Sequence, residues 1–464
     1  MLPASYYPRA GSPASAGFAV AGVKAAVGTT LGSGVPDDHH EIRGYLSKVT
    51  DQLLAAGQAA GAGDPGKSLE LSRALRERHY STAGELLGTG LFTQFHSELE
   101  TEFDALDELL RGIAAVGELT PRTTDLVASF GERISSRIVT SAFTVRDLPA
   151  AHVDSRKCVI TDANHTKAVP LFPEIDLRLA RQVKPLLEKK QIPVMGGFIG
   201  GTREGATTTL GRGGSDFTAA IVGAGLGAES IEIWTDVDGM MTTDPRLCKE
   251  AHRIRTISFD EAAELAYFGA KVLHPATLLP AVQKDIPVLV LNSRNPGCEG
   301  TRITARAPQC RNYFKAIAAK RRITIVDVVA TRMLMAHGFL KSIFEVFDHH
   351  RCPVDMVCTS EVSVSLTVDS TEAIPAIAAE LEKLADVKYE GRKAIVCLVG
   401  ENIRGTRGIA AKVFGALPET NVRMISQGAS EINISFVIEE DDVDETVRTL
   451  HEVFFADPDP AIFA

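Results

Sequence analysis

With 464 residues, 59 acidic and 49 basic side chains and a net charge of −10, the chain can form two or three domains, and its charge excludes a strongly basic nucleic-acid-binding surface. No apolar run approaches the roughly 20 residues that span a bilayer. Seven cysteines without a C-x-x-C pair favour a reducing compartment over a disulfide framework. We therefore expect a soluble, cytoplasmic protein that binds neither nucleic acid nor membrane.

Residues 1–46 are rich in Ala, Gly, Pro and Ser and show no clear strand or helical period. This composition is typical of disordered segments. The segment also lacks the basic start and compact apolar core of a cleaved signal peptide. We expect an atypical stretch without regular structure.

The middle of the chain changes from helical to alternating patterns. Apolar residues recur at helical spacing over residues 67–87 and 92–116. Further on, the pattern predicts strands at residues 157–161, 193–198, 230–235 and 287–291, and helices at residues 176–188 and 216–225. This alternation predicts an α/β sandwich around a mainly parallel sheet. Ligands of such sheets bind beyond the carboxyl ends of strands, where the loops after Phe198 and Thr235 fall.

A glycine-rich turn, G-R-G-G-S-D at residues 211–216, is the strongest local signal. Glycines allow the backbone to approach an anion, and Ser215 and Asp216 fall where a helix would begin and offer its N–H groups to phosphate. Arg212 adds a fixed positive charge. The turn predicts a nucleotide-phosphate site.

An acidic loop follows the predicted strand that ends at Thr235. It carries Asp236, Asp238 and Asp244, followed by Arg246. Hard oxygen ligands beside a cation suit a magnesium nucleotide, although Asp-Gly and Asp-Pro are also ordinary turn sequences. Together with the glycine-rich turn, the loop favours nucleotide binding.

Three further positions each allow two interpretations. Lys271 in F-G-A-K-V-L-H-P could reach a phosphate or simply be solvated. Glu132, which we expect at the start of a helix, could stabilise the helix dipole or bind a substrate ammonium group. The pair His349-His350 lies near Cys352 and invites a metal hypothesis, but adjacent side chains on a helix point apart, so we expect no metal site held by protein ligands alone.

An internal repeat appears when the last third of the chain is compared with itself at an offset of 70 residues. Gly338 matches Gly408, and S-E-V-S-V-S at residues 360–365 matches S-E-I-N-I-S at residues 430–435. Each copy alternates like a half-buried strand after a helical segment. The repeat predicts two small βαββαβ units.

Seven motifs give the chain from about residue 47 a long and specific resemblance to the aspartate kinases. They are K-V-T-D-Q-L-L (48–54), S-F-G-E-R-I-S-S (129–136), G-F-I-G (197–200), T-T-T-L-G-R-G-G-S-D (207–216), W-T-D-V-D-G (234–239), T-T-D-P-R (242–246) and F-G-A-K-V-L-H-P-A-T (268–277). The last third is similar to the tandem ACT domains of the lysine-sensitive class.

The resemblance implies an amino-acid-kinase αβα sandwich followed by two ferredoxin-like α+β (ACT) domains. The expected domains are a catalytic domain at 47–305 and ACT domains at 320–390 and 391–464. The implied reaction is ATP-dependent phosphorylation of the L-aspartate side chain to 4-phospho-L-aspartate, the first step towards lysine, threonine and methionine. Magnesium would accompany ATP, lysine would be the inhibitor, with threonine or no effector as alternatives, and a homodimer would form through the ACT domains.

Site residues follow from the same resemblance, position by position. The aspartate site would involve Thr50, Glu132, Phe198, Arg212, Ser215 and Asp216, of which Arg212, Ser215 and Asp216 would be catalytic. The ATP site would involve Thr235, Asp236, Arg246, Lys271 and Val272. The effector site would involve Met333, Gly338, Phe339, Leu340, Val354, Asp355, Ser360 and Glu361.

The first strand of the family is the main departure. The family begins with K-F-G-G-T-S, whose lysine and glycines face the phosphates; here the nearest text is K-A-A-V-G-T-T at residues 24–30, so Lys24 is a weak match. One hypothesis is that residues 1–46 derive from a shifted reading frame. A second is a catalytically impaired sensor that binds an amino acid through its ACT region. A kinase of another small acid, such as glutamate, is a third.

Overall fold

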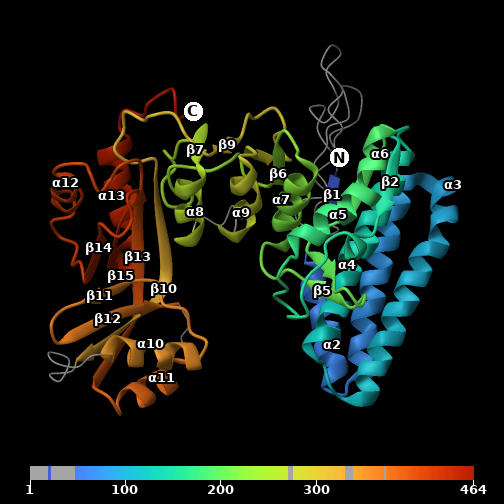
Figure 1. Ribbon diagram of the computed structural model, residues 1–464, viewed down its shortest axis with the longest axis horizontal. Coiled ribbons are helices and arrows are strands. Elements are labelled where there is room, and N and C mark those ends of the chain that lie inside the picture. The colour runs from blue at the N-terminus through green and yellow to red at the C-terminus, as the bar shows by residue number, and fades with distance from the viewer. Residues whose placement is uncertain (1–18, 22–47, 270–274, 330–337, 370–371) are drawn as a thin grey trace. The chain divides into compact units, whose positions relative to one another are not determined.

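The computed structural model describes residues 19–21, 48–269, 275–329, 338–369 and 372–464 (Figure 1). The chain forms two compact units, Met1–Gly239 with Leu273–Ala305, and Met240–Val272 with Arg306–Ala464. Four residues singled out in the sequence lie outside the described parts of the chain, namely Lys24, Lys271, Val272 and Met333.

Three helices form one end of the first unit: α2 (Val49–Gly61), α3 (Pro65–Val116) and α4 (Pro121–Thr144). Asp64 and Thr120 cap α3 and α4 by accepting N–H groups three residues on, and proline follows each cap. Their apolar faces share a core that includes Leu53, Leu99 and Ile134. The two helices predicted over residues 67–116 are α3, which is interrupted by non-helical backbone at Gly88 (φ 69°).

A parallel sheet lies beside these helices. It contains β1 (Ala19–Ala21), β3 (Ile192–Gly196) and β2 (Ala150–Val153) in that order. In the same unit β6 (Ile231–Thr235) pairs in parallel with β8 (Val288–Asn292), which pairs antiparallel with β9 (Thr301–Thr304). The remaining elements are the hairpin β4 (Ile199–Gly201) and β5 (Thr207–Thr209) and the helices α5 (Phe172–Gln182), α6 (Lys184–Glu188), α7 (Gly214–Leu226) and α9 (Pro275–Lys284).

The mainly parallel α/β architecture is therefore confirmed, with two local corrections. Residues 157–161 do not form a strand; the side chain of Asp154 accepts the Arg156 N–H and caps a 3₁₀ turn, η2 (Ser155–Lys157). The expectation of no strand in residues 1–46 is wrong at Ala19–Ala21, which pairs with β3.

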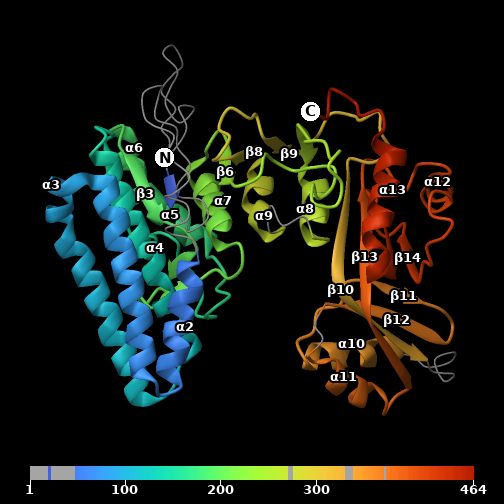
Figure 2. The ribbon, with the colours of Figure 1, turned by 180° about the vertical axis from the view of Figure 1, so that it is seen from behind.

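The second unit begins with β7 (Thr256–Ser258) and α8 (Phe259–Tyr267) and contains a six-stranded sheet of order β11-β12-β10-β13-β15-β14, antiparallel throughout (Figure 2). Its elements are β10 (Ala316–Val329), α10 (Phe339–His349), β11 (Val357–Thr359), β12 (Ser363–Val368), α11 (Ile374–Leu381), β13 (Asp386–Val399), α12 (Ile409–Gly415), β14 (Met424–Gln427), β15 (Asn433–Glu439), η4 (Glu440–Asp442) and α13 (Val443–Phe455).

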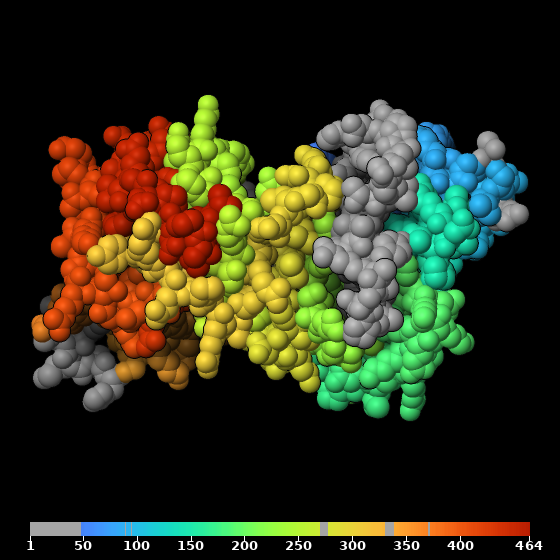
Figure 3. All heavy atoms as spheres, turned by 90° about the horizontal axis from the view of Figure 1, so that it is seen from above, coloured from blue at the N-terminus to red at the C-terminus, as the bar shows by residue number. Residues whose placement is uncertain are grey.

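The predicted repeat is visible in these bounds, because β13, α12 and β15 each begin 70 residues after β10, α10 and β12. The first copy is a complete βαββαβ unit that ends in β13. The second copy has no closing strand of its own; the first half of β10 pairs with the second half of β13 and takes that place. Figure 3 shows the atoms of the segments from β13 to α13, orange to red, grouped on one part of the surface.

Candidate active site

The glycine-rich turn leads directly into α7, as predicted. Gly211 and Gly213 have φ values of 76° and 73°, which residues with a Cβ rarely adopt. Gly213 is the N-cap, and no side chain caps the helix. The first turn of α7 therefore presents its positive end beside Ser215, which is suited to an anion.

Close packing of glycines brings the turn to the end of β3. A Cβ on Gly197 would lie 2.9 Å from Ser215 Cα, and a Cβ on Gly196 would lie 3.1 Å from both the Cβ and the carbonyl oxygen of Glu132. Only glycine permits the first of these approaches without movement. Glu132 thus lies against Gly196, the last residue of β3, and Ser215 lies against the next residue, Gly197. Both therefore lie at the carboxyl end of β3, where the α/β architecture predicts a ligand site.

Phe198 has left-handed backbone, with φ 65°. Its N–H donates to Thr218 Oγ1 at 3.0 Å and to the Gly214 carbonyl at 3.3 Å, and its carbonyl accepts the Leu210 N–H at 2.9 Å. A Cβ on Gly214 would lie 2.7 Å from Phe198 Cδ2. These contacts hold a strained residue at the site, as is common where function requires one geometry.

Glu132 lies in the middle of α4, not at a helix start, so the dipole interpretation is wrong. Its side chain is 2% exposed. Thr50 is on α2, whose residues Val49 and Leu53 pack against Gly131 at 3.2 and 3.3 Å from the position of an added Cβ. The helix contact at Gly131 therefore brings the turn of α2 that carries Thr50 beside Glu132.

Asp125 of α4 organises the site and was missed from the sequence. This carboxylate, 1% exposed, accepts hydrogen bonds from Thr209 Oγ1 at 2.6 Å and the Thr166 N–H at 3.0 Å, and contacts His165 Nδ1 at 2.8 Å. Since Leu210 alone separates Thr209 from the glycine-rich turn, Asp125 fixes the strand that leads into it. The available signal was a carboxylate on the apolar face of a helix.

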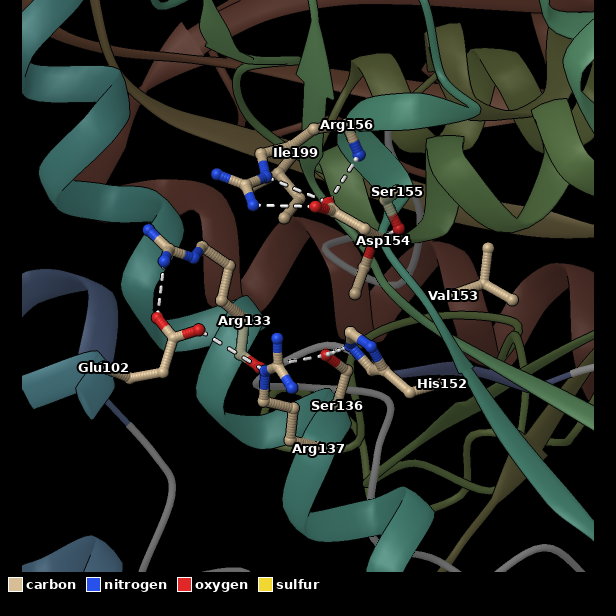
Figure 4. A pocket seen from close by; sticks show the side chains of 11 residues that line it. Glu102, Arg133, Ser136, Arg137, His152, Val153, Asp154, Ser155, Arg156 and Ile199 are labelled. Carbon is tan, nitrogen blue, oxygen red and sulfur yellow. Dashed lines mark hydrogen bonds and ion pairs between the residues drawn. The ribbon is translucent and has the colours of Figure 1, made fainter. Parts of the chain in front are cut away.

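A polar pocket lies beside the carboxyl end of β3 and is lined by residues of α3 and α4 and by residues 152–156 (Figure 4). Arg133 and Arg137, one helical turn apart on α4, both pair with Glu102 of α3, at 2.5 and 3.4 Å. This i, i+4 pair of arginines in R-I-S-S-R was a signal that the sequence analysis did not use. The arginines tie α3 to the face of α4 that borders the pocket.

The other wall of the pocket supports β3 directly. Ser155 Oγ donates to the Gly196 carbonyl at 2.5 Å, and Arg156 pairs with Asp154 at 2.7 Å. Burial, and then the nearby Arg137, lowers the pKa of His152 to about 4, so this imidazole is neutral at pH 7. Because its charges are paired, we interpret this pocket as a support for the β3 end.

Arg212 is exposed and has no ion-pair partner among the residues that the structure describes. Its guanidinium is therefore available for an acidic ligand, consistent with its predicted role. Asp216 lies in the first turn of α7.

The predicted nucleotide residues of the first unit follow β6. The Thr235 carbonyl accepts from the Ser293 N–H and hydroxyl at 3.0 and 2.8 Å, which fixes the strand end. Asp238 accepts from the amides of Asn292 and Asn295 at 2.7 and 3.2 Å and so shapes the loop. Asp236 is exposed. An exposed carboxylate at a strand end fits a magnesium ion, which prefers one or two carboxylates together with phosphates.

Arg246 lies in the second unit and forms a fork with Asp244, with Nη2 to Oδ2 at 2.6 Å and Nε to Oδ1 at 3.0 Å. The hydrogen bonds that the guanidinium donates to Asp244 raise the pKa of Arg246. Asp236 and Asp238 belong to the first unit and Asp244 to the second, and a nucleotide role for Arg246 stays a prediction.

The described effector residues predicted for the second unit lie at the start of α10, just before β11, and in the turn between β11 and β12. Gly338, at φ 86°, is the N-cap of α10, and Phe339 and Leu340 form its first turn. Ser360 Oγ accepts the Ser363 N–H at 3.2 Å in the turn between β11 and β12. The remaining described members of this set are Val354, Asp355 and Glu361.

Asp355 is engaged by two groups that the sequence did not predict. Lys320 Nζ lies 2.8 Å from both carboxylate oxygens, and the Tyr267 hydroxyl donates to Oδ1 at 2.8 Å. Burial and the bond to Asp355 raise the pKa of Tyr267. Tyr267 ends α8, four residues before the F-G-A-K-V-L-H-P lysine at 271, so Asp355 contacts the helix that leads into that motif.

Comparisons with known proteins identify the family. Residues 47–292 match the model of the amino acid kinase family, and residues 396–454 match an ACT domain. Aspartokinase 1, chloroplastic, of Arabidopsis thaliana is 39% identical over 430 residues, covering 89% of this chain and 74% of that protein. The lysine-sensitive aspartokinase 3 of Escherichia coli K12 is 36% identical, covering 88% and 90%.

The chain belongs to the amino acid kinase family, and within it to the aspartokinases. Its fold agrees: E. coli aspartokinase III in complex with aspartate and ADP superposes with a TM-score of 0.77 at 37% identity, covering 88% of this chain and 90% of that one. The complex of the same enzyme with lysine and aspartate gives 0.74. In the parts of the aspartokinase chain that the structure describes, no helix is both long and apolar enough to cross a membrane.

Proposed function

We propose that this chain transfers the γ-phosphoryl group of ATP to the side-chain carboxylate of L-aspartate and that lysine inhibits the reaction. The observation that carries the catalytic proposal is the meeting of Glu132 and Ser215 at Gly196 and Gly197, with Arg212 in the adjoining turn. This arrangement provides a carboxylate for an ammonium group and a fixed cation for a carboxylate.

In this mechanism the substrate carries its own nucleophile. Glu132 pairs with the ammonium group of aspartate, and Arg212 holds a carboxylate through two parallel hydrogen bonds. An oxygen of the aspartate side-chain carboxylate attacks the γ-phosphorus, the bond from the γ-phosphorus to the β-phosphate oxygen breaks, and ADP leaves. Since the attacking carboxylate is already ionised at neutral pH, the residues act mainly by positioning two anions and screening their repulsion.

The N-terminus of α7 and Arg212 supply positive potential where negative charge gathers. Asp236 would hold magnesium, whose charge would screen the phosphates. Thr235 lies at the end of β6, where the fixed backbone would position the nucleotide. Asp125 keeps the turn in register through Thr209.

Differences between the two ACT copies support an effector site in the first. The residue 70 positions after Asp355 is Ile425, which has no charge, and the equivalent of Glu361 is Glu431, which is paired with Arg404. Glu361 is exposed. At these two equivalent positions the first copy therefore offers two carboxylates for the cationic groups of lysine, and the second copy offers one.

The test is ATP turnover by the full chain with L-aspartate, with and without lysine, trapping the acyl phosphate with hydroxylamine. We expect aspartate-dependent product that lysine suppresses. Arg212→Lys should lower kcat/KM for aspartate by roughly 100-fold, because a bidentate contact becomes a single one. Arg203→Lys, an exposed arginine of the same unit paired with Glu174, is the matched control and should have little effect.

The absence of a K-F-G-G-T-S sequence before residue 47 favours a second candidate function, an amino-acid sensor without catalysis. Lysine binding without any ATP turnover would establish it in place of the kinase. Turnover with glutamate and not aspartate would indicate a kinase of another acid.

A further inference from the structure

The described residues contain one cluster of metal-ligating side chains outside the active and effector sites. His349, His350 and Glu380 each place one ligand atom within 4.8 Å of the other two. His349 Nδ1 lies 3.1 Å and His350 Nε2 lies 2.9 Å from the same atom, Glu380 Oε2. The two imidazoles therefore converge on one carboxylate oxygen.

The local backbone explains why neighbouring histidines can point to one place. His349 is the last residue of α10, and His350 lies beyond it as the C-cap, with φ −85° and ψ 3°. The argument that adjacent ligands on a helix point apart fails at this position, because His350 has left the helical path. The two rings lie 4.9 Å apart with a tilt of 42° between their planes.

The third donor, Glu380, comes from a second helix, α11, which packs in the same core as α10. Glu380 belongs to α11, one residue before Leu381, which is fully buried, and Phe347 of α10 is buried in the same core. The donors are less buried, with side-chain exposures of 69% for His349, 22% for His350 and 33% for Glu380. An ion could thus enter from solvent while the core holds both helices.

The donor set suits a divalent ion of intermediate softness. Zinc binds imidazole nitrogen and carboxylate oxygen at about 2.0 to 2.2 Å, so two donors on one tetrahedral ion lie about 3.3 to 3.6 Å apart, which is only slightly more than the 3.1 and 2.9 Å between each histidine and Glu380 Oε2. Two neutral imidazoles and one carboxylate form a set that zinc accepts with water in the fourth position. The hydrogen bonds between Glu380 and the histidines occupy the same space that an ion would fill.

We propose that His349, His350 and Glu380 form a zinc-binding site that links the end of α10 to α11 in the first ACT copy. The ion is structural or regulatory and takes no part in phosphoryl transfer. Three of the predicted effector residues, Gly338, Phe339 and Leu340, lie at the other end of the same helix. The proposal does not depend on the identity of the effector.

The experiment measures zinc affinity of the full chain by competition with a chromophoric chelator. We expect the full chain to bind one zinc ion. The affinity for zinc should fall at least ~10-fold in His350→Gln and in Glu380→Gln, since even residues that only hydrogen-bond to metal ligands contribute that much. The control is His96→Gln, an exposed histidine beside Glu100 on α3, which should leave the affinity unchanged. Far-UV circular dichroism checks that each variant is folded.

Cobalt(II) substitution gives a second readout, because thiolate ligands produce an intense near-ultraviolet charge-transfer band and nitrogen and oxygen ligands do not. We expect visible d–d bands without that band, lost in Glu380→Gln. Zinc binding in both site variants that is as strong as in the parent chain, a thiolate band, or no binding of zinc by the parent chain would overturn the proposal.

Discussion

At the scale of single residues, three positions are unusual in conformation or burial. Phe198 is strained in the left-handed region, and Asp125 is a buried carboxylate with three donors around it; both belong to the candidate site. His79 is a buried imidazole in α3, within the helical core. Each can be tested by a substitution that changes one property at a time.

The strain at Phe198 predicts an inverted preference between glycine and alanine. At φ 65°, Phe198→Gly should be more stable than Phe198→Ala by about 1 kcal/mol, because alanine retains the left-handed penalty. The measurement is the urea midpoint of each variant. At Phe217, a helical position in α7, the same pair should show alanine favoured by about 1 kcal/mol. A common order at both positions would refute the role of strain.

His79 predicts acid sensitivity of the helical part of the first unit. Burial lowers its pKa to about 4, so between about pH 6.5 and pH 4 the unfolded chain takes up a proton that the folded chain does not. The free energy of unfolding should therefore fall as the pH decreases through this range, by up to about 1.4 kcal/mol per pH unit.

Urea unfolding at pH 7.5 and 5.5 checks this effect. His79→Leu should show a smaller loss of stability between the two pH values than the parent chain, whereas the exposed His96→Gln should not. If both variants lose as much stability as the parent, burial of His79 is not the cause.

At the scale of elements, the sequence patterns predicted where helices and strands occur better than they predicted which segments contact one another. The glycine-rich turn predicted the start of α7 because positive φ is readable from glycine, and the offset of 70 residues predicted the repeated strands because alternation is local. The prediction that Glu132 begins a helix was wrong, because the sequence S-F-G-E does not indicate that the helix begins earlier, at Pro121. The contacts of Asp125 with Thr209, and of Asp355 with Lys320, join segments distant in sequence, and no local pattern reports them.

The ion pair between Lys320 of β10 and Asp355, which precedes β11, predicts how strongly the effector lysine inhibits the reaction. Lys320 already neutralises Asp355, so an incoming ammonium group must compete with it. Lys320→Met should lower the lysine concentration for half inhibition by roughly tenfold, about 1.4 kcal/mol of binding. The measurement is a lysine titration of kinase activity. Arg321→Met, the neighbouring cation paired with Asp444, is the control, and weaker inhibition in Lys320→Met would contradict competition.

At the scale of the whole molecule, the two compact units divide the predicted ligand contacts. The residues assigned to aspartate lie in the first unit and those assigned to the effector lie in the second. A ligand stabilises the elements that it contacts, in proportion to its occupancy. The intact chain should therefore report each ligand in a different set of amides.

Hydrogen exchange on the full chain tests this division. Aspartate should slow exchange most in α4 and at the start of α7, and lysine most in α10 and the β11 to β12 turn, because bound ligands suppress local opening. Slowing by aspartate that is confined to the second unit would contradict the assignment of Glu132 and Ser215.

The sharing of β10 and β13 has a consequence for how such a chain can be divided or can evolve. A gene fragment that starts at residue 391 cuts β13 after its first five residues and omits Ala316–Lys320, the stretch that pairs with Ile395–Val399. The fragment would expose the unpaired edge of a buried strand, which promotes aggregation. We therefore expect the two copies to fold only when they are kept together, and a soluble regulatory fragment to begin before β10.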